Sequence, residues 1–232
     1  MTNLLIATRN AHKVEEIRCI LGERFRYLTL NDFPSSPVVI EDSDSLLGNA
    51  RKKSIELAKW LAVHPEILIA KTGESKGQVF VLADDSGLEV DALNGAPGVH
   101  SARFAAMDIN APGNSPDNVN NAKLLRLLTH ISPEKRSARF RCVVSLTRVN
   151  FSSWTKKMVP SSDSSLASET VVFEGTCEGR IAEKPQGTGG FGYDPLFVPT
   201  GYDASFAALS PSIKNKLSHR AQALEKLRKG FR

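Results

Sequence analysis

The chain has 232 residues, 41% of them hydrophobic and 24% charged, which is typical of a globular protein, and no segment approaches the roughly 18 apolar residues that a membrane span requires. The first residues lack a secretory signal and the three cysteines are widely spaced. We therefore expect a cytoplasmic protein with reduced thiols, no zinc site and no membrane partner. The net charge of +5 fits either nucleic acid or a polyanionic ligand such as a nucleotide, and by itself it selects neither.

Short apolar runs at residues 4–7 and 27–30 predict two strands, and apolar spacing over residues 14–21 predicts a helix between them. The loop before this helix places backbone N–H groups and the positive end of the helix dipole at one point, which favours an anion. The residues of this loop and of the helix start are Thr8, Arg9, Asn10, Ala11, His12 and Lys13. An N-capped helix with a surface lysine explains the same residues without a ligand.

The next polar residues follow an apolar run at residues 38–40, which leads to a pair of acidic residues beginning with Glu41. Apolar residues at helical spacing over residues 46–61 then predict a helix. This helix carries Asn49 and Lys53 four residues apart, and therefore on one face.

Two adjacent carboxylates, Asp84 and Asp85, follow an apolar run and precede a Ser-Gly pair and a second apolar alternation. The pattern predicts a strand, an acidic turn and another strand. Because adjacent side chains of an extended chain point to opposite faces, we expect one catalytic or metal-binding carboxylate and one structural carboxylate. Alternatively, both aspartates only form the turn by hydrogen bonding to their own backbone.

Residues 71–78 are polar and predict an exposed loop. Residues 115–128 predict a helix that begins at the pair Ser115 and Pro116. Alternating apolar residues predict strands at 139–149 and 170–178. We expect these two strands to pair antiparallel around the serine-rich loop 151–169.

A glycine-rich segment covers residues 180–199 and contains a formal GxGxxG pattern. The Tyr-Asp-Pro that follows cannot open the helix that a dinucleotide-binding fold requires, so we exclude a Rossmann site. A flexible loop that presents Phe191, Tyr193 and Asp194 instead suits stacking and hydrogen bonding to a flat base. An ordinary turn with core aromatic residues accounts for the same pattern.

The C-terminal tail is rich in basic residues, most of which a solvated helix face explains. Ser218 is a predicted N-cap that holds His219 and Arg220 at the start of a helix. A histidine beside an arginine is more commonly a surface pair than a site.

Together, the segments TxNxxK, NARKK, ADDSGLEVDALNGAPGVHSAR, GTGGFGYDP and SHRxxAL resemble, in this order, the inosine triphosphate pyrophosphatase family. The resemblance runs from Leu4 to about Leu227. It implies one α/β domain over residues 1–232, elongated and two-lobed, around a long mixed β-sheet with a central nucleotide-binding groove, in a homodimer. The implied reaction is hydrolysis of ITP, dITP or XTP to the monophosphate and pyrophosphate, by metal-assisted attack of water on the α-phosphorus.

The resemblance also implies roles for particular residues. Asp85 would be the catalytic base and, with Glu41, a ligand of Mg²⁺, while Asp84 would either bind the metal or support its ligands, and the resemblance does not decide between these two roles. The implied substrate contacts are Thr8, Arg9, Asn10, Ala11, His12, Lys13, Lys53, Ser86, Phe191, Gly192, Tyr193, Asp194, Lys214, His219 and Arg220. The last three residues would close the base pocket and donate to the oxygen at C6 of hypoxanthine or xanthine.

The chain departs from the family at Gly48, where the family's helix usually carries glutamate. If that glutamate contributes to the metal site of the family, Glu41 and Asp85 would have to coordinate the metal without it. Segments 71–78 and 151–169 resemble insertions. A second possibility is a Maf-like pyrophosphatase acting on the pyrimidine nucleotides dTTP or UTP, which should not share the GFGYDP and SHR segments. A third is a non-enzymatic nucleic-acid-binding protein, suggested only by the basic charge; the paired carboxylates argue against it, and we expect no nucleic-acid partner.

Overall fold

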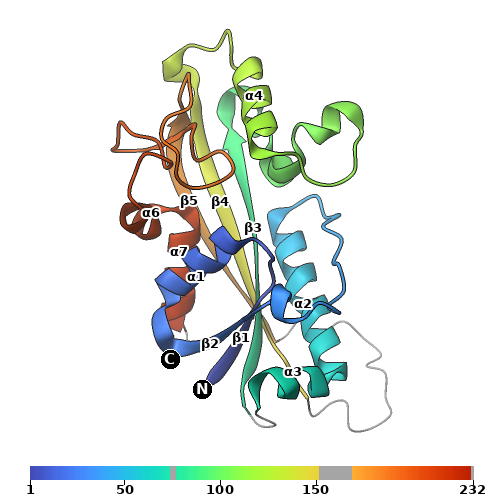
Figure 1. Cartoon of the computed structure of the whole chain (residues 1–232). Coiled ribbons are helices and arrows are strands. Elements are labelled where there is room, and N and C mark those ends of the chain that lie inside the picture. Colours follow the sequence, from blue (N-terminus) through green and yellow to red (C-terminus); the bar gives the residue numbers. More distant parts are fainter. Residues whose placement is uncertain (74–76, 152–168, 231–232) are drawn as a thin grey trace. The chain divides into compact units, whose positions relative to one another are not determined.

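The computed structural model describes residues 1–73, 77–151 and 169–230, and in it six strands form one mixed sheet (Figure 1). The strands are β1 Thr2–Ile6, β2 Phe25–Thr29, β3 Val79–Val90, β4 Ser137–Arg148, β5 Thr170–Ile181 and β6 Phe197–Pro199. Their order is β2-β1-β3-β4-β5-β6, with β1 parallel to β2 and β3, and β5 antiparallel to β6. The expected mixed α/β fold class is confirmed.

Among the described residues, four helices follow the predicted periodicity, and two short helices were not predicted. The helices are α1 Ala11–Leu21, α2 Leu46–Val63, α3 Pro65–Thr72, α4 Asp117–Leu127, α6 Pro211–Leu217 and α7 His219–Gly230. Short 3₁₀ helices lie at Gly22–Arg24, Leu30–Asp32, Asp91–Leu93, Gly98–Arg103, Ala106–Ile109 and Pro133–Lys135. Among the described residues, no helix combines the length and the apolar character needed to cross a membrane.

The chain divides into two compact units, each with its own apolar core. The first unit comprises Met1–Asp85, Val143–Phe173 and Leu227–Arg232, and the second comprises Ser86–Cys142 and Glu174–Lys226. Asp85 and Ser86, which are consecutive in β3, therefore belong to different units.

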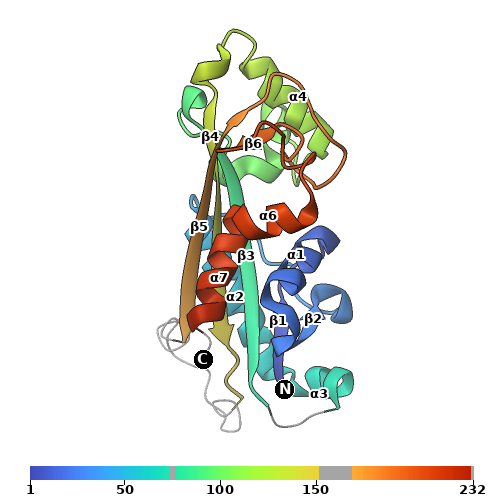
Figure 2. The same cartoon turned by 90° about the vertical axis from the view of Figure 1, so that its left-hand side faces the viewer.

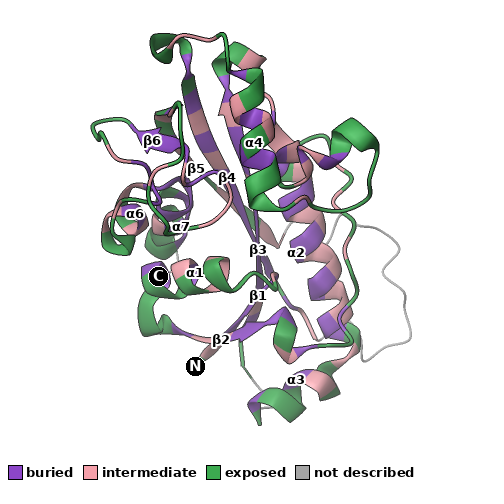
Figure 3. Cartoon of the chain, turned by 45° about the horizontal axis from the view of Figure 1, so that its top comes forward, coloured by how far each residue is buried: buried purple, intermediate pink, exposed green. Residues whose placement is uncertain are grey.

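In the first unit, α1 and α2 lie on opposite faces of the sheet (Figures 1 and 2). The odd-numbered residues Val79, Val81 and Ala83 of β3 share a buried core with Leu57 and Leu61 of α2. The buried residues of α2 run along one side of that helix (Figure 3). Because side chains alternate along a strand, the even-numbered residues of β3 face the side of the sheet that carries α1.

The predicted acidic turn is wrong, because β3 continues without a break from Val79 to Val90. The glycine that suggested a turn serves a different purpose: a Cβ atom at Gly87 would lie 2.3 Å from the carbonyl oxygen of Gly98. Its absence lets that neighbouring segment approach the strand, where the Oγ of Ser101 accepts a hydrogen bond from the N–H of Leu88 at 2.8 Å. The carboxylates therefore lie within a continuous strand.

The predicted antiparallel pairing of β4 with β5 is confirmed. The N–H of Arg148 donates to the carbonyl oxygen of Glu169 at 3.4 Å, and the N–H of Ile181 donates to that of Arg136 at 2.9 Å. Residue numbers rise along one strand as they fall along the other, which is the pattern of an antiparallel pair.

The expected exposed loop 71–78 is wrong in its first two residues, because Lys71 and Thr72 end α3 and Thr72 is buried. A proline at the first position of α3 explains why His64 and Pro65 end one helix and begin another. Of the two segments expected as insertions, residues 74–76 and 152–168 lie outside the described residues.

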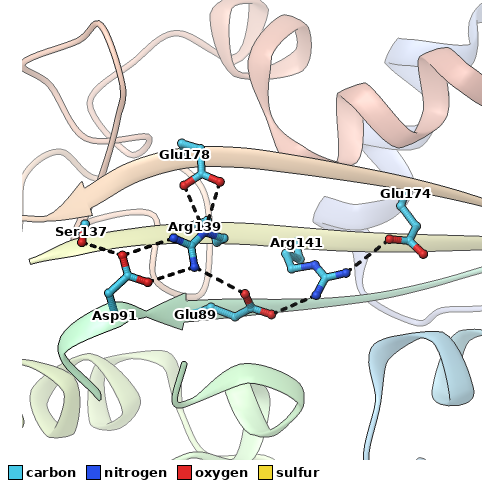
Figure 4. A network of polar contacts seen from close by, with 7 residues as sticks. All are labelled: Glu89, Asp91, Ser137, Arg139, Arg141, Glu174 and Glu178. Carbon is cyan, nitrogen blue, oxygen red and sulfur yellow. Dashed lines mark hydrogen bonds and ion pairs between the residues drawn. The ribbon is translucent and has the colours of Figure 1, made fainter. Parts of the chain in front are cut away.

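In the second unit, one face of β3, β4 and β5 carries a network of charged side chains (Figure 4). Its members are Glu89, Asp91, Ser137, Arg139, Arg141, Glu174 and Glu178. Arg139 Nη1 lies 3.0 Å from Asp91 Oδ1, and its Nε lies 3.1 Å from Glu178 Oε2. Hydrogen bonds from Ser137 and Arg139 hold the pKa of Asp91 below its usual value. Because partly exposed pairs contribute little stability, the network mainly fixes which side chains of the three strands stand opposite each other.

Candidate active site

The two adjacent aspartates of β3 point to opposite faces of the sheet and contact different helices. Asp84 Oδ2 lies 3.1 Å from the Lys13 Nζ of α1, and Asp85 Oδ2 accepts a hydrogen bond from the Asn49 Nδ2 of α2 at 3.1 Å. Both aspartates are more than nine-tenths buried. The separation expected from strand alternation is therefore present, and it gives Asp84 an ion-pair partner on the face opposite Asp85.

Asp85 has a strongly shifted acidity. Burial raises its pKa to about 6, because a charged carboxylate is poorly solvated in this position. Lys13 lowers the pKa, Glu41 raises it, and Lys53 and the hydrogen bond from Asn49 lower it again. At neutral pH the group is mostly ionised, and its pKa is close enough to neutrality for it to accept a proton and release it again.

Lys53 and Glu41 form the charged surroundings of Asp85. The Lys53 Nζ lies 2.7 Å from Glu41 Oε1 and donates to the carbonyl oxygen of Asp84 at 3.3 Å. Burial alone lowers the pKa of Lys53, but the carboxylates of Glu41, Asp84 and Asp85 more than offset this effect, and the pKa lies above its usual value. Lys53 therefore remains a cation that can contact an anionic ligand.

A metal ion at this place would have to use few protein ligands. Among the described residues, no group of three or more His, Cys, Asp or Glu side chains is arranged to hold a metal. Asp85 and Glu41 are near enough for their charges to interact, and both offer the hard oxygen atoms that Mg²⁺ prefers. Since Mg²⁺ commonly binds one or two carboxylates and completes its shell with phosphate oxygens and water, the pair fits this ion.

The N-terminal loop uses part of its polar groups to cap α1. Asn10 Oδ1 accepts hydrogen bonds from the N–H groups of His12 and Lys13 at 2.9 and 3.3 Å, and the Thr8 Oγ1 accepts from the N–H of Asn10 at 3.1 Å. Arg9 Nη2 donates to the Ser36 side chain at 3.2 Å. Two of the N–H groups at the helix start are thus already bonded, so side chains such as Lys13 are better placed to contact an anion than the helix end itself.

Gly48 leaves room for the segment that carries Glu41. A Cβ atom at Gly48 would lie 1.9 Å from the Ser43 Oγ, so the hydroxymethyl group of Ser43 occupies the space of a side chain at position 48. The N–H of Ser43 also donates to Asn49 Oδ1 at 2.9 Å. The side-chain amide of Asn49 therefore joins the Glu41 segment to Asp85.

Asn49 contacts the candidate base Asp85, and the sequence did not reveal this contact. Helical spacing placed it on one face with Lys53, and both are buried, but nothing in the local sequence indicated its contact with Asp85. Polar side chains at helical spacing among the apolar residues of one helix face are the signal that could have identified it.

Replacing Asn49 with alanine is expected to shift the acidic limb of the pH–activity profile upward by about one pH unit or more. A hydrogen bond to a charged group contributes roughly 1.5 kcal/mol or more, and one pKa unit corresponds to about 1.4 kcal/mol. The check is kcat/KM measured from pH 5 to pH 8 for Asn49→Ala and for Glu56→Gln, a control two turns farther along α2. An unchanged limb in folded Asn49→Ala would contradict this role.

The predicted base-binding residues of the second unit lie together around a buried ion pair. The Lys214 Nζ lies 2.5 Å from Asp194 Oδ2, and both side chains are at most 7% exposed. The same carboxylate accepts from the N–H of Phe191 at 2.8 Å. The Phe191 ring centre lies 4.8 Å from Lys214 Nζ and 5.7 Å from the Arg220 Cζ, within the range of cation–π attraction.

The other members of this group are also fixed by contacts inside the second unit. Arg220 is 1% exposed and its Nη2 donates to the Ser86 Oγ at 3.4 Å. The His219 ring stacks on Phe140 with centres 4.6 Å apart. Burial and Asp117 hold the pKa of Tyr193 above its usual value, so its hydroxyl stays protonated and donates to a backbone oxygen.

His219, Arg220 and Lys214 are therefore not surface residues, and a solvated helix face does not account for them. Ser218 caps the helix as predicted, since its Oγ accepts from the N–H of Ala221 at 3.2 Å.

Comparison with known proteins identifies relatives over nearly the whole chain. The profile of the Ham1 family matches residues 4–230. A dITP/XTP pyrophosphatase of Shouchella clausii is 39% identical over 228 residues, which cover 98% of this chain and 96% of that protein. One of Geobacillus kaustophilus is 40% identical over 228 residues, which cover 98% of this chain and 93% of that protein.

Solved structures agree with the sequence relatives. A HAM1 protein from Coxiella burnetii matches with a TM-score of 0.73 and 32% identity, covering 100% of this chain and 98% of that one. The Ham1 protein of Staphylococcus aureus matches with a TM-score of 0.71 and 32% identity, covering 99% and 97%. The resemblance that the sequence motifs indicated is confirmed, and the chain belongs to the Ham1 family.

Proposed function

We propose that the chain hydrolyses non-standard purine nucleoside triphosphates, namely ITP, dITP and XTP, to the monophosphate and pyrophosphate. Relatives that share 39–40% of their sequence with it are dITP/XTP pyrophosphatases. The observation that carries the proposal is the buried Asp85, whose pKa of about 6 suits a proton acceptor and which lies among the cations Lys13 and Lys53.

Asp85 acts as the base in this proposal. A water oxygen forms a bond to the α-phosphorus while Asp85 accepts the proton of that water. The bond from the α-phosphorus to the bridging oxygen breaks, and pyrophosphate leaves with the electron pair. Proton transfer to a positioned base of matched pKa typically accelerates a reaction by about 10²- to 10⁴-fold.

The residues proposed to hold Mg²⁺ are Asp85 and Glu41. When bound, the ion neutralises phosphate charge and makes a coordinated water more acidic. Because Lys53 contacts Glu41 in the present arrangement, we propose that Lys53 releases this carboxylate when triphosphate supplies other negative charge.

The first unit is proposed to bind the phosphates. Lys13 and Lys53 supply buried or half-buried positive charge, and electrostatic stabilisation of this kind is strong because the groups are partly shielded from water. The remaining proposed phosphate contacts are Thr8, Arg9, Asn10, Ala11 and His12.

The second unit is proposed to bind the base and to select it. Phe191 offers an aromatic face, Gly192 and Tyr193 complete the loop, and Asp194 orients Lys214. Lys214, His219 and Arg220 supply donors, with Ser86 contacting the substrate near Arg220. These groups donate hydrogen bonds to the C6 oxygen of hypoxanthine or xanthine, whereas the C6 amino group of adenine is itself a donor and would be left unmatched, which disfavours ATP.

Three further properties belong to the proposal. We propose that the chain works as one nucleotide-hydrolysing domain in a homodimer, without a nucleic-acid or membrane partner. The cysteines Cys19, Cys142 and Cys177 form no disulfide, which supports a reducing compartment such as the cytoplasm. Light scattering of the purified protein measures the oligomeric state directly.

The test is pyrophosphate release from ITP, dITP, XTP, ATP, dTTP and UTP with and without Mg²⁺. We expect kcat/KM for ITP to exceed that for ATP by at least about 100-fold, since a site built for a hydrogen-bonding group discriminates strongly against its absence. Turnover should disappear when Mg²⁺ is removed with EDTA and return when it is added back. Preference for dTTP or UTP would replace the proposal by a Maf-like activity, and salt-dependent duplex binding without hydrolysis would favour a nucleic-acid-binding protein.

A further inference from the structure

Two side chains of helix α4 form hydrogen bonds with the backbone N–H and the carbonyl oxygen of Gly192. This residue lies in the loop that is proposed to bind the base. The N–H of Gly192 donates to Asp117 Oδ2 at 2.7 Å. Its carbonyl oxygen accepts from Asn121 Nδ2 at 2.9 Å. Asp117 and Asn121 are four residues apart and therefore lie on one face of the helix. All three residues belong to the second unit.

Hydrogen bonds between Phe191 and Asp194 close the loop around Gly192. Contacts that fix Gly192 therefore also help to fix its neighbours. The N–H of Phe191 donates to Asp194 Oδ2 at 2.8 Å, and the N–H of Asp194 donates to the carbonyl oxygen of Phe191 at 3.2 Å. Gly192 itself has a φ angle of +62°, in the left-handed region that glycine adopts readily. Because Gly192 follows Phe191 directly, a shift of Gly192 also moves the backbone that carries the Phe191 ring.

Asn121 keeps a polar side chain in a buried place where an apolar one would be expected. It is 9% exposed, and among the described residues its Oδ1 has no hydrogen-bond partner. A buried acceptor without a partner destabilises a fold, and a leucine of similar size would avoid this effect. The contact from Nδ2 to Gly192 is the feature that a leucine could not supply.

We propose that Asp117 and Asn121 are positioning residues that set the place of the Phe191 ring, and with it the preference of the base pocket for one purine over another. The inference rests on the proposed function of the Phe191–Asp194 loop in base binding. The two residues act through Gly192 and need no contact with the substrate.

The consequence for selectivity follows from the surroundings of Phe191. The Lys214 ammonium and the Arg220 guanidinium lie over its ring, so the position of the ring is tied to that of these two proposed donors. A small displacement of the ring changes the alignment of the C6 group with the donors. It does not change Asp85 or the phosphate-binding cations. Selectivity should therefore suffer more than the rate of the chemical step.

The test compares Asn121→Leu and Asp117→Ala with the parent chain, using kcat and KM for ITP and ATP. In each variant we expect the ITP:ATP ratio of kcat/KM to fall about threefold to tenfold, the range that corresponds to loss of one hydrogen bond. Most of the change should appear in KM for ITP, and kcat should stay within about twofold. The double variant should lose less than the product of the single losses, because both residues hold the same glycine.

Two controls separate positioning from a merely structural role. Asp117→Asn retains an oxygen acceptor and should restore the ratio, while Asn118→Ala, at an exposed position of the same turn, should leave it unchanged. Thermal denaturation confirms that each variant is folded. A ratio within twofold of the parent in folded Asn121→Leu and folded Asp117→Ala would overturn the inference.

Calorimetric binding of ITP and ATP without Mg²⁺ gives the same ratio independently of turnover. If the parent chain does not hydrolyse ITP, the proposed function fails. The binding ratios then still decide whether α4 controls base preference.

Discussion

Replacing Asp85 with asparagine is expected to abolish turnover and, at the same time, to stabilise the folded protein. The amide cannot accept a proton from water and carries no charge for a metal ion, so we expect kcat to fall by about 10³-fold or more. The measurement is pyrophosphate release from ITP at saturating Mg²⁺. Near-normal turnover in folded Asp85→Asn would refute Asp85 as the base.

The gain in stability follows from the raised pKa of this carboxylate. In the unfolded chain the group ionises near its usual value of 3.8, whereas in the folded chain burial delays ionisation to about 6. Between these values the folded state binds more protons, so the free energy of unfolding decreases as pH rises through this window and stays low above it. A difference of about two pKa units corresponds to roughly 3 kcal/mol at pH 8.

The stability difference should therefore depend on pH. We expect Asp85→Asn to unfold at a higher urea concentration than the parent at pH 8, and at nearly the same concentration at pH 4. Asp84→Asn is the matched control, because it changes the adjacent residue but removes the ion-pair partner of Lys13. That control should be less stable than the parent at pH 8. Equal destabilisation by both changes would show that burial does not disfavour the Asp85 charge.

Replacing Lys214 with methionine is expected to destabilise the chain by about 3 kcal/mol or more, because it removes the ammonium partner of the buried Asp194 carboxylate. Methionine approximately keeps the volume of the lysine stem, so the loss reflects the unpaired charge more than a cavity. Urea denaturation at pH 7 measures the effect. The variant should also lose selectivity for ITP over ATP, since Lys214 is a proposed donor to the base.

A second substitution separates the two consequences of losing Lys214. Changing Asp194 to asparagine in the same chain removes the unpaired charge and should recover most of the lost stability. The selectivity for ITP should not recover, because the donor is still absent. Recovery of both properties in the double variant would mean that Lys214 supports the fold and does not select the base.

The periodic parts of the fold could be predicted from the sequence because they depend on local spacing of apolar residues. The strands β4 and β5 themselves and the buried face of α2 are examples. The acidic turn could not be recognised as a continuous strand, because a Ser-Gly pair is a good local turn signal. What overrides it is the close approach of Gly98 to Gly87, eleven residues away in the chain.

The site residues were recognisable as motifs, but their environments were not. Lys214 and Arg220 lie in a basic tail whose sequence is typical of a solvated helix face. They are buried because Lys214 contacts Asp194 and Arg220 contacts Phe191, which are at least 20 residues away in the chain. Asn49 likewise acquires its role only when α2 packs against β3. Local sequence specifies a helix face, whereas the partner of that face is set by tertiary packing.

The continuous course of β3 through Asp84 and Asp85 limits how the length of this strand can change. Suppose that one residue were inserted before Ala83 and the pleat of the strand were kept. Ala83 would then occupy the place that Asp84 has now, and Asp84 would occupy the place that Asp85 has now. If one residue were deleted there, the position of Asp85 would receive Ser86, while that of Asp84 would keep a carboxylate. An insertion would thus remove the partner of Lys13 and keep the base, and a deletion would do the opposite.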